Sequence, residues 1–319
     1  MKRSSILDIK AQILDGVSTF TTPRDPLGLG RTVKNGENLL AVRIPGQSSF
    51  WRNKLTWLKK LTCGEMDVRF VGDVMALPTE TPWHRGRVRP LKIGSSISHG
   101  RVTAGTLGCF VTDPKGRVLI LSNNHVMACS NKAEKGDPIC QPGTHDGGTI
   151  ADDSIAVLDH FEVIKEKGNL IDAAVAVVNS DIECDLSSLF GLGKNSGFYQ
   201  DDIEPGDIVC KFGRTTNTTL GRITAVEMDS VGVGGYFDSG APAYFDQQIE
   251  IEGAEAGPFC QGGDSGSVVF SAPKGREGEH RALGLLFAGG PRGGSNGQGL
   301  TYVNYLSTVL SKMGVTVLS

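Results

Sequence analysis

A serine in a glycine-rich turn is the clearest chemical feature of this chain. Ser265 lies in the run Gln-Gly-Gly-Asp-Ser-Gly-Ser at 261–267, directly before an apolar segment at 268–270. A serine hydroxyl is a weak nucleophile that needs a nearby base and a group that orients this base. The flanking glycines let the backbone bend so that the N–H groups of Gly263 and Ser265 converge on a developing oxyanion. The turn therefore predicts a nucleophile and an oxyanion hole, against the alternative of an ordinary surface turn.

Two other residues have the right types and settings to serve as its partners. His125 follows an apolar run at 118–121 through a polar turn, and it is the predicted general base. Asp172 stands at the start of an apolar run at 173–178 that we expect to be a buried strand. A buried aspartate holds an imidazole in the needed tautomer and stabilises the imidazolium. The sequence thus predicts a catalytic triad of His125, Asp172 and Ser265.

The order of these three residues matches that of chymotrypsin and differs from the orders of subtilisin and the α/β-hydrolases. From about residue 105 to its end, the chain resembles the trypsin-like (chymotrypsin-fold) serine proteases. Beyond the triad, the resemblance rests on the segments 105–111, 211–223, 282–290 and 299–303. The resemblance implies a mainly β protein, a chymotrypsin-like double β-barrel with a C-terminal helix, that acts as a serine endopeptidase. The spellings Asn-Asn-His and Asp-Ala-Ala around the triad are similar to intracellular bacterial and plant members of the NARROW LEAF type.

The same resemblance locates the substrate pocket. It implies a base near Phe259 and Cys260 and a wall that includes Phe287, Ala288 and Gly289. None of these residues is acidic, so we expect an uncharged residue before the cleaved bond.

The aspartate before the nucleophile needs a partner if it is buried. No Ile-Val-Gly-Gly start precedes the barrels, which argues against activation by a newly cut N-terminus. In streptogrisin-like proteases a basic side chain fills this role, and the resemblance implies Lys211 as the partner of Asp264. The alternative is an Asp264 that stays solvated until a substrate or partner orders the loop.

Composition indicates a soluble enzyme without an electrostatic footprint for nucleic acid or an anionic membrane. The chain has 319 residues, 39% of them hydrophobic, and a formal net charge of −3. The basic N-terminus lacks the continuous apolar core of a secretory signal, and no apolar run is long enough to span a bilayer. Seven cysteines cannot all pair within one chain, which favours reduced thiols and a cytoplasmic location.

The chain is expected to contain two domains, a small α+β domain over 1–90 and the protease domain over 91–319. Apolar spacing predicts a helix from Ser5 to about residue 20, a strand at 40–44, a helix at 50–61 and a strand at 68–74. The proline-rich stretch 78–90 is the expected linker. The N-terminal domain could be a pro-segment, a structural brace, or a docking module for a regulatory partner or a second copy. At the other end, Asn304 is expected to cap a last helix that Gly314 stops.

Several other motifs in the sequence compete with the protease interpretation. His125, Cys129, Cys140 and His145 form a pattern that could hold zinc, but their spacing is not that of a common finger. The glycine-rich run 231–235 does not open a helix, so it is expected to be a flexible turn rather than a nucleotide loop. The protease mechanism needs no metal and no organic cofactor. An esterase with the same chemistry, and a protease-fold scaffold with an unused triad, remain alternatives.

Overall fold

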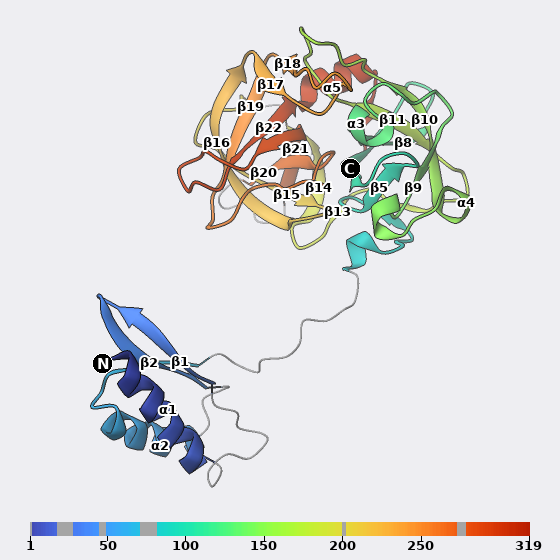
Figure 1. The fold of residues 1–319 in the computed structure, drawn as a ribbon. Coiled ribbons are helices and arrows are strands. Elements are labelled where there is room, and N and C mark those ends of the chain that lie inside the picture. Colours follow the sequence, from blue (N-terminus) through green and yellow to red (C-terminus); the bar gives the residue numbers. More distant parts are fainter. Residues whose placement is uncertain (1, 18–27, 45–48, 71–81, 200–201, 273–278) are drawn as a thin grey trace. The chain divides into compact units, whose positions relative to one another are not determined.

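The computed structural model describes residues 2–17, 28–44, 49–70, 82–199, 202–272 and 279–319. The chain divides into two compact units, Met1–Glu80 and Thr81–Ser319, which are drawn in Figure 1. Each unit has hydrophobic core residues of its own. No helix in the described part of the chain combines the length and the apolar character needed to cross a bilayer.

The first unit is a small α+β structure. Strand β2 is central, and it pairs antiparallel with β1 and parallel with β3. Its core contains Ile6 and Ile13 from the first helix, Leu58 from the second, and Leu40, Val42 and Ile44 from β2. The elements are α1 (Arg3–Val17), β1 (Gly28–Lys34), β2 (Glu37–Ile44), α2 (Ser49–Leu61) and β3 (Met66–Phe70).

Strand β1 was absent from the sequence-based order of helix, strand, helix, strand. The turn between β1 and β2 consists of Asn35 and Gly36, with φ angles of 52° and 80°. Asn-Gly is the preferred pair for a two-residue hairpin turn because both positions need a positive φ. This dipeptide was the signal that could have revealed β1. Residues 18–20 and 71–74, which were expected to extend α1 and β3, lie outside the described residues.

The first sheet of the second unit has eight strands in the order β23-β7-β8-β11-β10-β9-β5-β6. Among the described pairings, its edge strands β23 and β6 do not pair with each other, so this sheet is open. Three short helical turns, α3 (Asn124–Met127), η2 (Thr144–Asp146) and α4 (Ile150–Asp153), lie between its strands. The strands are β5 (Ser96–His99), β6 (Gly105–Thr106), β7 (Cys109–Thr112), β8 (Val118–Ser122), β9 (Pro138–Cys140), β10 (Ser154–Phe161), β11 (Ala174–Val178) and β23 (Thr316–Val317).

A second sheet closes into a six-stranded barrel, since β22 pairs with both β19 and β21. All six pairings around the ring β21-β20-β15-β16-β19-β22 are antiparallel. In Figure 1 this barrel is yellow to red and lies beside the mostly green first sheet. Its strands are β15 (Ile208–Gly213), β16 (Asn217–Met228), β19 (Gln248–Gly253), β20 (Val268–Ser271), β21 (Glu279–Gly290) and β22 (Leu300–Tyr305), and β13 (Ser188–Leu189) and β14 (Gly193–Phe198) extend the sheet at β21.

The C-terminal helix α5 (Leu306–Met313) follows the closed barrel. With the open first sheet as a half-barrel beside it, the mainly β, chymotrypsin-like fold is as expected. Gly314 ends the helix with a φ of 62°, and its N–H donates to the carbonyls of Leu310 and Ser311. The predicted N-cap was wrong, because Tyr305 occupies that position and Asn304 belongs to β22. The side chain of Asn304 is instead used inside the unit, as described below.

The remaining strands form two small pairs, and one of them corrects a sequence-based expectation. Residues 231–235 were expected to be a flexible turn, but β17 (Val231–Val233) pairs antiparallel with β18 (Ala243–Phe245). The other pair joins β4 (Leu91–Lys92) to β12 (Cys184–Asp185) in parallel.

Residues 82–90, which were expected to be part of a linker, pack onto the second unit. Trp83, in the short helical turn η1 (Trp83–Arg85), stacks on Phe212 of β15 with ring centroids 5.5 Å apart. Arg85 Nε donates to the Arg214 carbonyl at 3.0 Å. The described part of the expected linker is therefore ordered structure of the barrel unit, and residues 78–81 lie outside the described residues.

Candidate active site

His125 and Asp172 come from two neighbouring strand ends. Strands β8 and β11 are antiparallel, with Ser122 opposite Ala174, so the end of β8 lies beside the start of β11. His125 follows β8 on α3, and its Nδ1 is hydrogen-bonded to Asp172 Oδ2. The His125 backbone N–H also donates to Asp172 Oδ1 at 3.3 Å. The aspartate side chain is fully buried, whereas that of the histidine is 25% exposed, so the outer face of the ring remains accessible.

The buried aspartate has partners that the sequence did not reveal. Tyr236, in the loop after β17, donates its hydroxyl to Asp172 Oδ2 at 2.6 Å. Burial and then the carboxylate charge raise the pKa of Tyr236 well above its ordinary value, so the phenol keeps the proton that it donates. The Asp172 backbone N–H donates to Asn304 Oδ1 at 3.0 Å, and Asn123 Nδ2 donates to the Asp172 carbonyl at 2.7 Å. Both the carboxylate and the backbone of Asp172 are therefore held in place.

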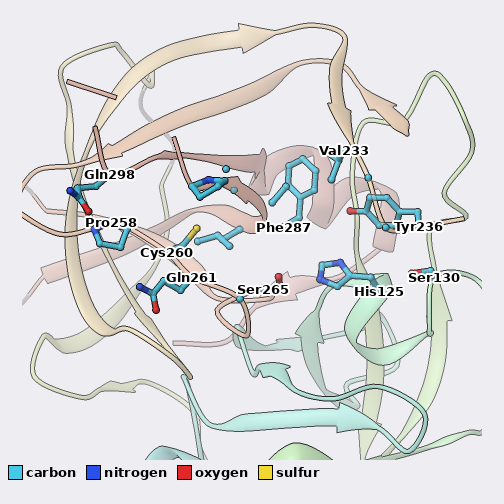
Figure 2. A pocket seen from close by; sticks show the side chains of 18 residues that line it. His125, Ser130, Val233, Tyr236, Pro258, Cys260, Gln261, Ser265, Phe287 and Gln298 are labelled. Carbon is cyan, nitrogen blue, oxygen red and sulfur yellow. The ribbon is translucent and has the colours of Figure 1, made fainter. Parts of the chain in front are cut away.

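Ser265 lies in the turn that leads into β20. The Thr106 N–H of β6 donates to the Ser265 carbonyl at 2.8 Å, which ties this turn to the first sheet. Gly266, with a φ of 90°, has no room for a side chain, because a Cβ would lie 2.0 Å from Ser122 Oγ. Figure 2 shows the side chains of Ser265 and His125 pointing toward one another in a pocket that both line. Among the described contacts, no hydrogen bond joins these two side chains.

Two peptide groups of the serine turn are oriented through their carbonyls. The Gly262 carbonyl accepts from Thr215 Oγ1 at 2.7 Å, and the Asp264 carbonyl accepts from Ser267 Oγ at 2.6 Å. In a trans peptide the N–H points opposite to the C=O. The N–H groups that follow, those of Gly263 and Ser265, therefore point away from Thr215 and Ser267. Within the described residues neither N–H has an acceptor, so both are free to bind an oxyanion.

Asp264, beside the serine, is fully buried and well bonded. Its carboxylate accepts the backbone N–H groups of Thr215, Thr216 and Gln261 at 2.8, 3.0 and 2.9 Å. Lys211 Nζ lies 3.7 Å from Asp264 Oδ2, in agreement with the partner implied by the resemblance, and the solvated alternative is wrong. Burial lowers the pKa of Lys211, and Asp264 acts in the opposite direction. A buried ion pair of this kind fixes the conformation of the turn that carries the nucleophile.

A second buried ion pair supports the same turn from the first sheet. The Arg214 guanidinium pairs with the Asp146 carboxylate, and both side chains are less than 10% exposed. Arg214 Nη1 also donates to Thr215 Oγ1 at 3.2 Å, and Arg85 Nη2 donates to the Thr215 carbonyl at 3.3 Å. Thr215, which orients the Gly262 peptide, is thus held by two arginines.

The pocket beside Ser265 has a volume of about 740 Å³. Four of the five expected pocket residues line it, namely Cys260, Phe287, Ala288 and Gly289. Phe259 does not, and this prediction was wrong: its side chain is 1% exposed and packs in the core of the closed barrel. Its neighbours Pro258 and Cys260 line the pocket instead.

The chemistry of the pocket wall is neutral. None of the 18 described residues that line it is an aspartate, glutamate, lysine or arginine. The Cys260 thiol accepts a hydrogen bond from Thr301 Oγ1 at 3.1 Å, which fixes the position of the sulfur. Apolar contact surface comes from Val233, Leu286 and Phe287.

Three of the four residues of the possible zinc pattern have other side-chain partners. His125 contacts Asp172, Cys129 contacts His99, and Cys140 contacts Ser98. Over the described ranges, no three His, Cys, Asp or Glu side chains are grouped so that they could hold a metal ion. All seven cysteines are free thiols.

Comparison with known proteins gives similarity of fold alone. No protein-family model matches the chain, and no curated protein matches it. Among solved structures, a glutamic acid-specific serine protease with a histidine triad in substrate binding is 19% identical, with a TM-score of 0.49. Protease A of Thermobifida fusca is 15% identical, with a TM-score of 0.47, and a Nocardiopsis protease is 16% identical, with a TM-score of 0.49. Each of the three comparisons covers 72% of this chain and 100% of the other.

Proposed function

We propose that this chain is a serine endopeptidase in which Ser265 is the nucleophile, His125 the general base and Asp172 the group that orients it. The main support is the bonded His125–Asp172 pair, which shares one pocket with Ser265 and with unpaired N–H groups in the serine turn. A base, an orienting carboxylate and an oxyanion hole are the parts that acyl transfer requires.

In the proposed reaction, Ser265 Oγ attacks the carbonyl carbon of the scissile bond while His125 Nε2 takes its proton. The Gly263 and Ser265 N–H groups stabilise the resulting oxyanion. The protonated imidazole then gives the proton to the leaving amine, and the acyl-enzyme forms. Water repeats the sequence with the same base and releases the acid. Throughout, Asp172 stabilises the imidazolium and is itself stabilised by Tyr236.

The substrate in this proposal is a polypeptide with an uncharged residue before the cleaved bond. A charged side chain in this pocket would find no opposite charge among the lining residues. A buried unpaired charge is unfavourable. The thiol of Cys260 and the ring of Phe287 instead favour an apolar side chain. The proposal also includes a place among the NARROW LEAF-type proteases and a reducing compartment. Seven free thiols support the reducing compartment.

Reaction with a fluorophosphonate probe tests this function directly. The purified full chain is expected to gain one adduct by intact mass, which peptide mapping locates at Ser265. Ser265→Ala abolishes the adduct, whereas Ser307→Ala, the same change at an exposed serine of α5 that does not line this pocket, retains it. A folded wild-type chain that gains no adduct would contradict the peptidase and favour the scaffold with an unused triad. A screen of peptide and ester substrates then separates a peptidase from an esterase.

A further inference from the structure

A second series of hydrogen-bonded side chains, Cys129, His99 and Asp137, lies outside the Ser265 site. Cys129 Sγ is 2.9 Å from His99 Nδ1, and His99 Nε2 is 3.1 Å from Asp137 Oδ2. The Glu134 N–H donates to the same carboxylate at 3.0 Å, and this bond together with the His99 contact lowers the pKa of Asp137. A thiol, an imidazole and a carboxylate in this order have the types of a nucleophile, its base and the group that orients the base.

The neighbouring contacts define the tautomer of His99. The Arg101 backbone N–H points at His99 Nδ1 from 3.1 Å, and a backbone N–H can only donate. Nδ1 therefore carries the lone pair, and the ring proton is on Nε2, where it faces Asp137. The Cys129 thiol then donates its proton toward Nδ1. A base is thus already in contact with the proton that the sulfur must lose in order to react.

The contact between Cys129 and His99 matters because a protonated thiol needs a base before it can react. Burial raises the pKa of the Cys129 thiol, although Arg101 and Lys132 oppose this effect. The thiol is consequently protonated at neutral pH, and its proton has to leave as the sulfur attacks. A thiol with a high pKa is a strong nucleophile once deprotonated, so transfer to an adjacent imidazole is the step that matters.

Cys129 differs from the other cysteines in combining access with a base. Cys109, Cys140 and Cys210 are buried, and the partly exposed Cys184 and Cys260 contact a carbonyl and a hydroxyl. Cys63 in the first unit is exposed and provides an internal reference. Among the described residues, Cys129 is the partly exposed thiol that is bonded to an imidazole.

The thiol also lies close to the proposed active site in the chain. Cys129, Ser130 and Asn131 have φ angles of 53°, 54° and 73°, so three consecutive residues other than glycine adopt the left-handed region. Such strained backbone is common at functional sites. The side chains of Asn124 and Asn131 hold this turn, with Asn124 Nδ2 donating to Asn131 Oδ1 at 2.8 Å. Ser130, in the middle of the turn, lines the pocket of Ser265.

We propose that Cys129 is a peroxide-reactive thiol with His99 as its base, a modification site separate from the peptidase triad. The sulfur attacks one oxygen of the peroxide while its proton passes to His99 Nδ1. The O–O bond breaks, and the departing hydroxide takes the proton back from Nδ1. The products with hydrogen peroxide are the sulfenic acid of Cys129 and one water, so the peroxide is the oxidant and the sulfur is oxidised.

The test is the rate of oxidation by hydrogen peroxide at each cysteine of the full chain. Dimedone traps the sulfenic acid, and peptide mapping by mass gives separate rates for Cys129 and Cys63. We expect Cys129 to react at least about tenfold faster than Cys63, since general-base assistance typically contributes about 100-fold or more. His99→Gln should reduce the Cys129 rate to within about threefold of the Cys63 rate, and it should leave Cys63 unchanged. Cys129→Ser should remove the adduct.

A second variant covers the case in which His99→Gln fails to fold. Asp137 is 31% exposed at its side chain, and Asp137→Asn should keep the fold while it weakens the orientation of His99. This variant should lower the Cys129 rate by at least about threefold, a smaller effect than loss of the base itself. Equal rates at Cys129 and Cys63 in the wild type, or a wild-type Cys129 rate in both variants, would overturn the proposal. The readout is the mass of the adduct, so it does not depend on peptidase activity.

Discussion

At the scale of single residues, the contact of Tyr236 with Asp172 is a feature of the site that can be tested without altering the triad. Tyr236→Phe removes one hydroxyl donor from a buried carboxylate and keeps the aromatic ring. A hydrogen bond to a charged group is worth about 1.5–3 kcal/mol, so we expect the second-order rate of fluorophosphonate labelling at Ser265 to fall at least about tenfold. With a peptide substrate, kcat should fall while KM stays the same, because this hydroxyl is bonded to the buried Asp172 carboxylate.

The matched control for this change is Tyr302→Phe. The Tyr302 hydroxyl donates to Glu250 Oε2 at 3.1 Å, away from the triad. We expect this variant to label at the wild-type rate. An unchanged labelling rate in a folded Tyr236→Phe protein would show that Asp172 is positioned adequately without the phenol.

Thr215 is a second positioning residue, and it acts through a peptide group. Thr215→Val keeps the side-chain shape but removes the hydroxyl that holds the Gly262 carbonyl at 2.7 Å. The peptide can then rotate and turn the Gly263 N–H out of the oxyanion hole. Loss of one oxyanion donor typically lowers kcat by about 100-fold or more, and a loosened donor should lower labelling by about tenfold. Thr224→Val, which loses a hydroxyl that is bonded to Glu250 and not to the serine turn, should have no effect on the labelling rate if the carbonyl contact is the cause.

At the scale of elements, the sequence predicted what local patterns encode. Ser265, His125 and Asp172 each lie beside an apolar strand. The apolar run of such a strand and the turn residues next to it can be recognised in the sequence. The residues that hold them were not predictable in this way. Tyr236 is 64 positions from Asp172 and Asn304 is 132 positions away, so the fold alone creates these contacts. For the same reason, Asn304 was wrongly assigned to a helix cap, and Phe259 was wrongly placed in the pocket.

The turn η1 carries a histidine whose burial makes stability depend on pH. His84 is 4% exposed, and its Nδ1 has no hydrogen-bond partner in the described structure. Burial, followed by the charge of Arg85, lowers its pKa below the ordinary value of 6.5. The unfolded chain therefore binds a proton at a higher pH than the folded chain does. This difference reduces stability as pH falls below about 6.5, down to the lower pKa of the folded state.

Calorimetry of the full chain between pH 8 and pH 5 checks this expectation. His84→Phe retains an aromatic ring against Trp83 and Phe212 but cannot titrate. The melting temperature of the second unit should fall less steeply with acid in this variant than in the wild type. Parallel slopes for the two proteins would mean that other groups carry the pH dependence.

At the scale of the whole molecule, the proposed active site draws all of its described residues from the second unit. The elements that brace it begin earlier than the sequence suggested, at residues 82–90 rather than after them. Trp83 stacks on Phe212, Arg85 binds the carbonyls of Arg214 and Thr215, and Arg89 Nη1 donates to Gln141 Oε1 at 2.6 Å. Proline content marked this stretch as a linker because prolines interrupt regular structure, but irregular segments can also be well packed.

Two truncations separate these interpretations. A chain that starts at residue 82 retains η1 and its contacts, so we expect it to melt like the second unit of the full chain and to label at Ser265 at the same rate. A chain that starts at residue 91 loses the stacking of Trp83 and both Arg85 bonds to the turn that holds Thr215. It should melt at least several degrees lower, since each lost hydrogen bond of a charged group is worth about 1.5–3 kcal/mol, and its labelling should slow about tenfold as the oxyanion turn loosens. Equal melting temperatures and labelling rates of the two truncated chains would instead support the interpretation of residues 82–90 as a linker.

The chain that starts at residue 82 also tests the role of the first unit. Faster labelling after removal of residues 1–81 would identify the first unit as an inhibitory pro-segment, and slower labelling would identify it as a brace of the site.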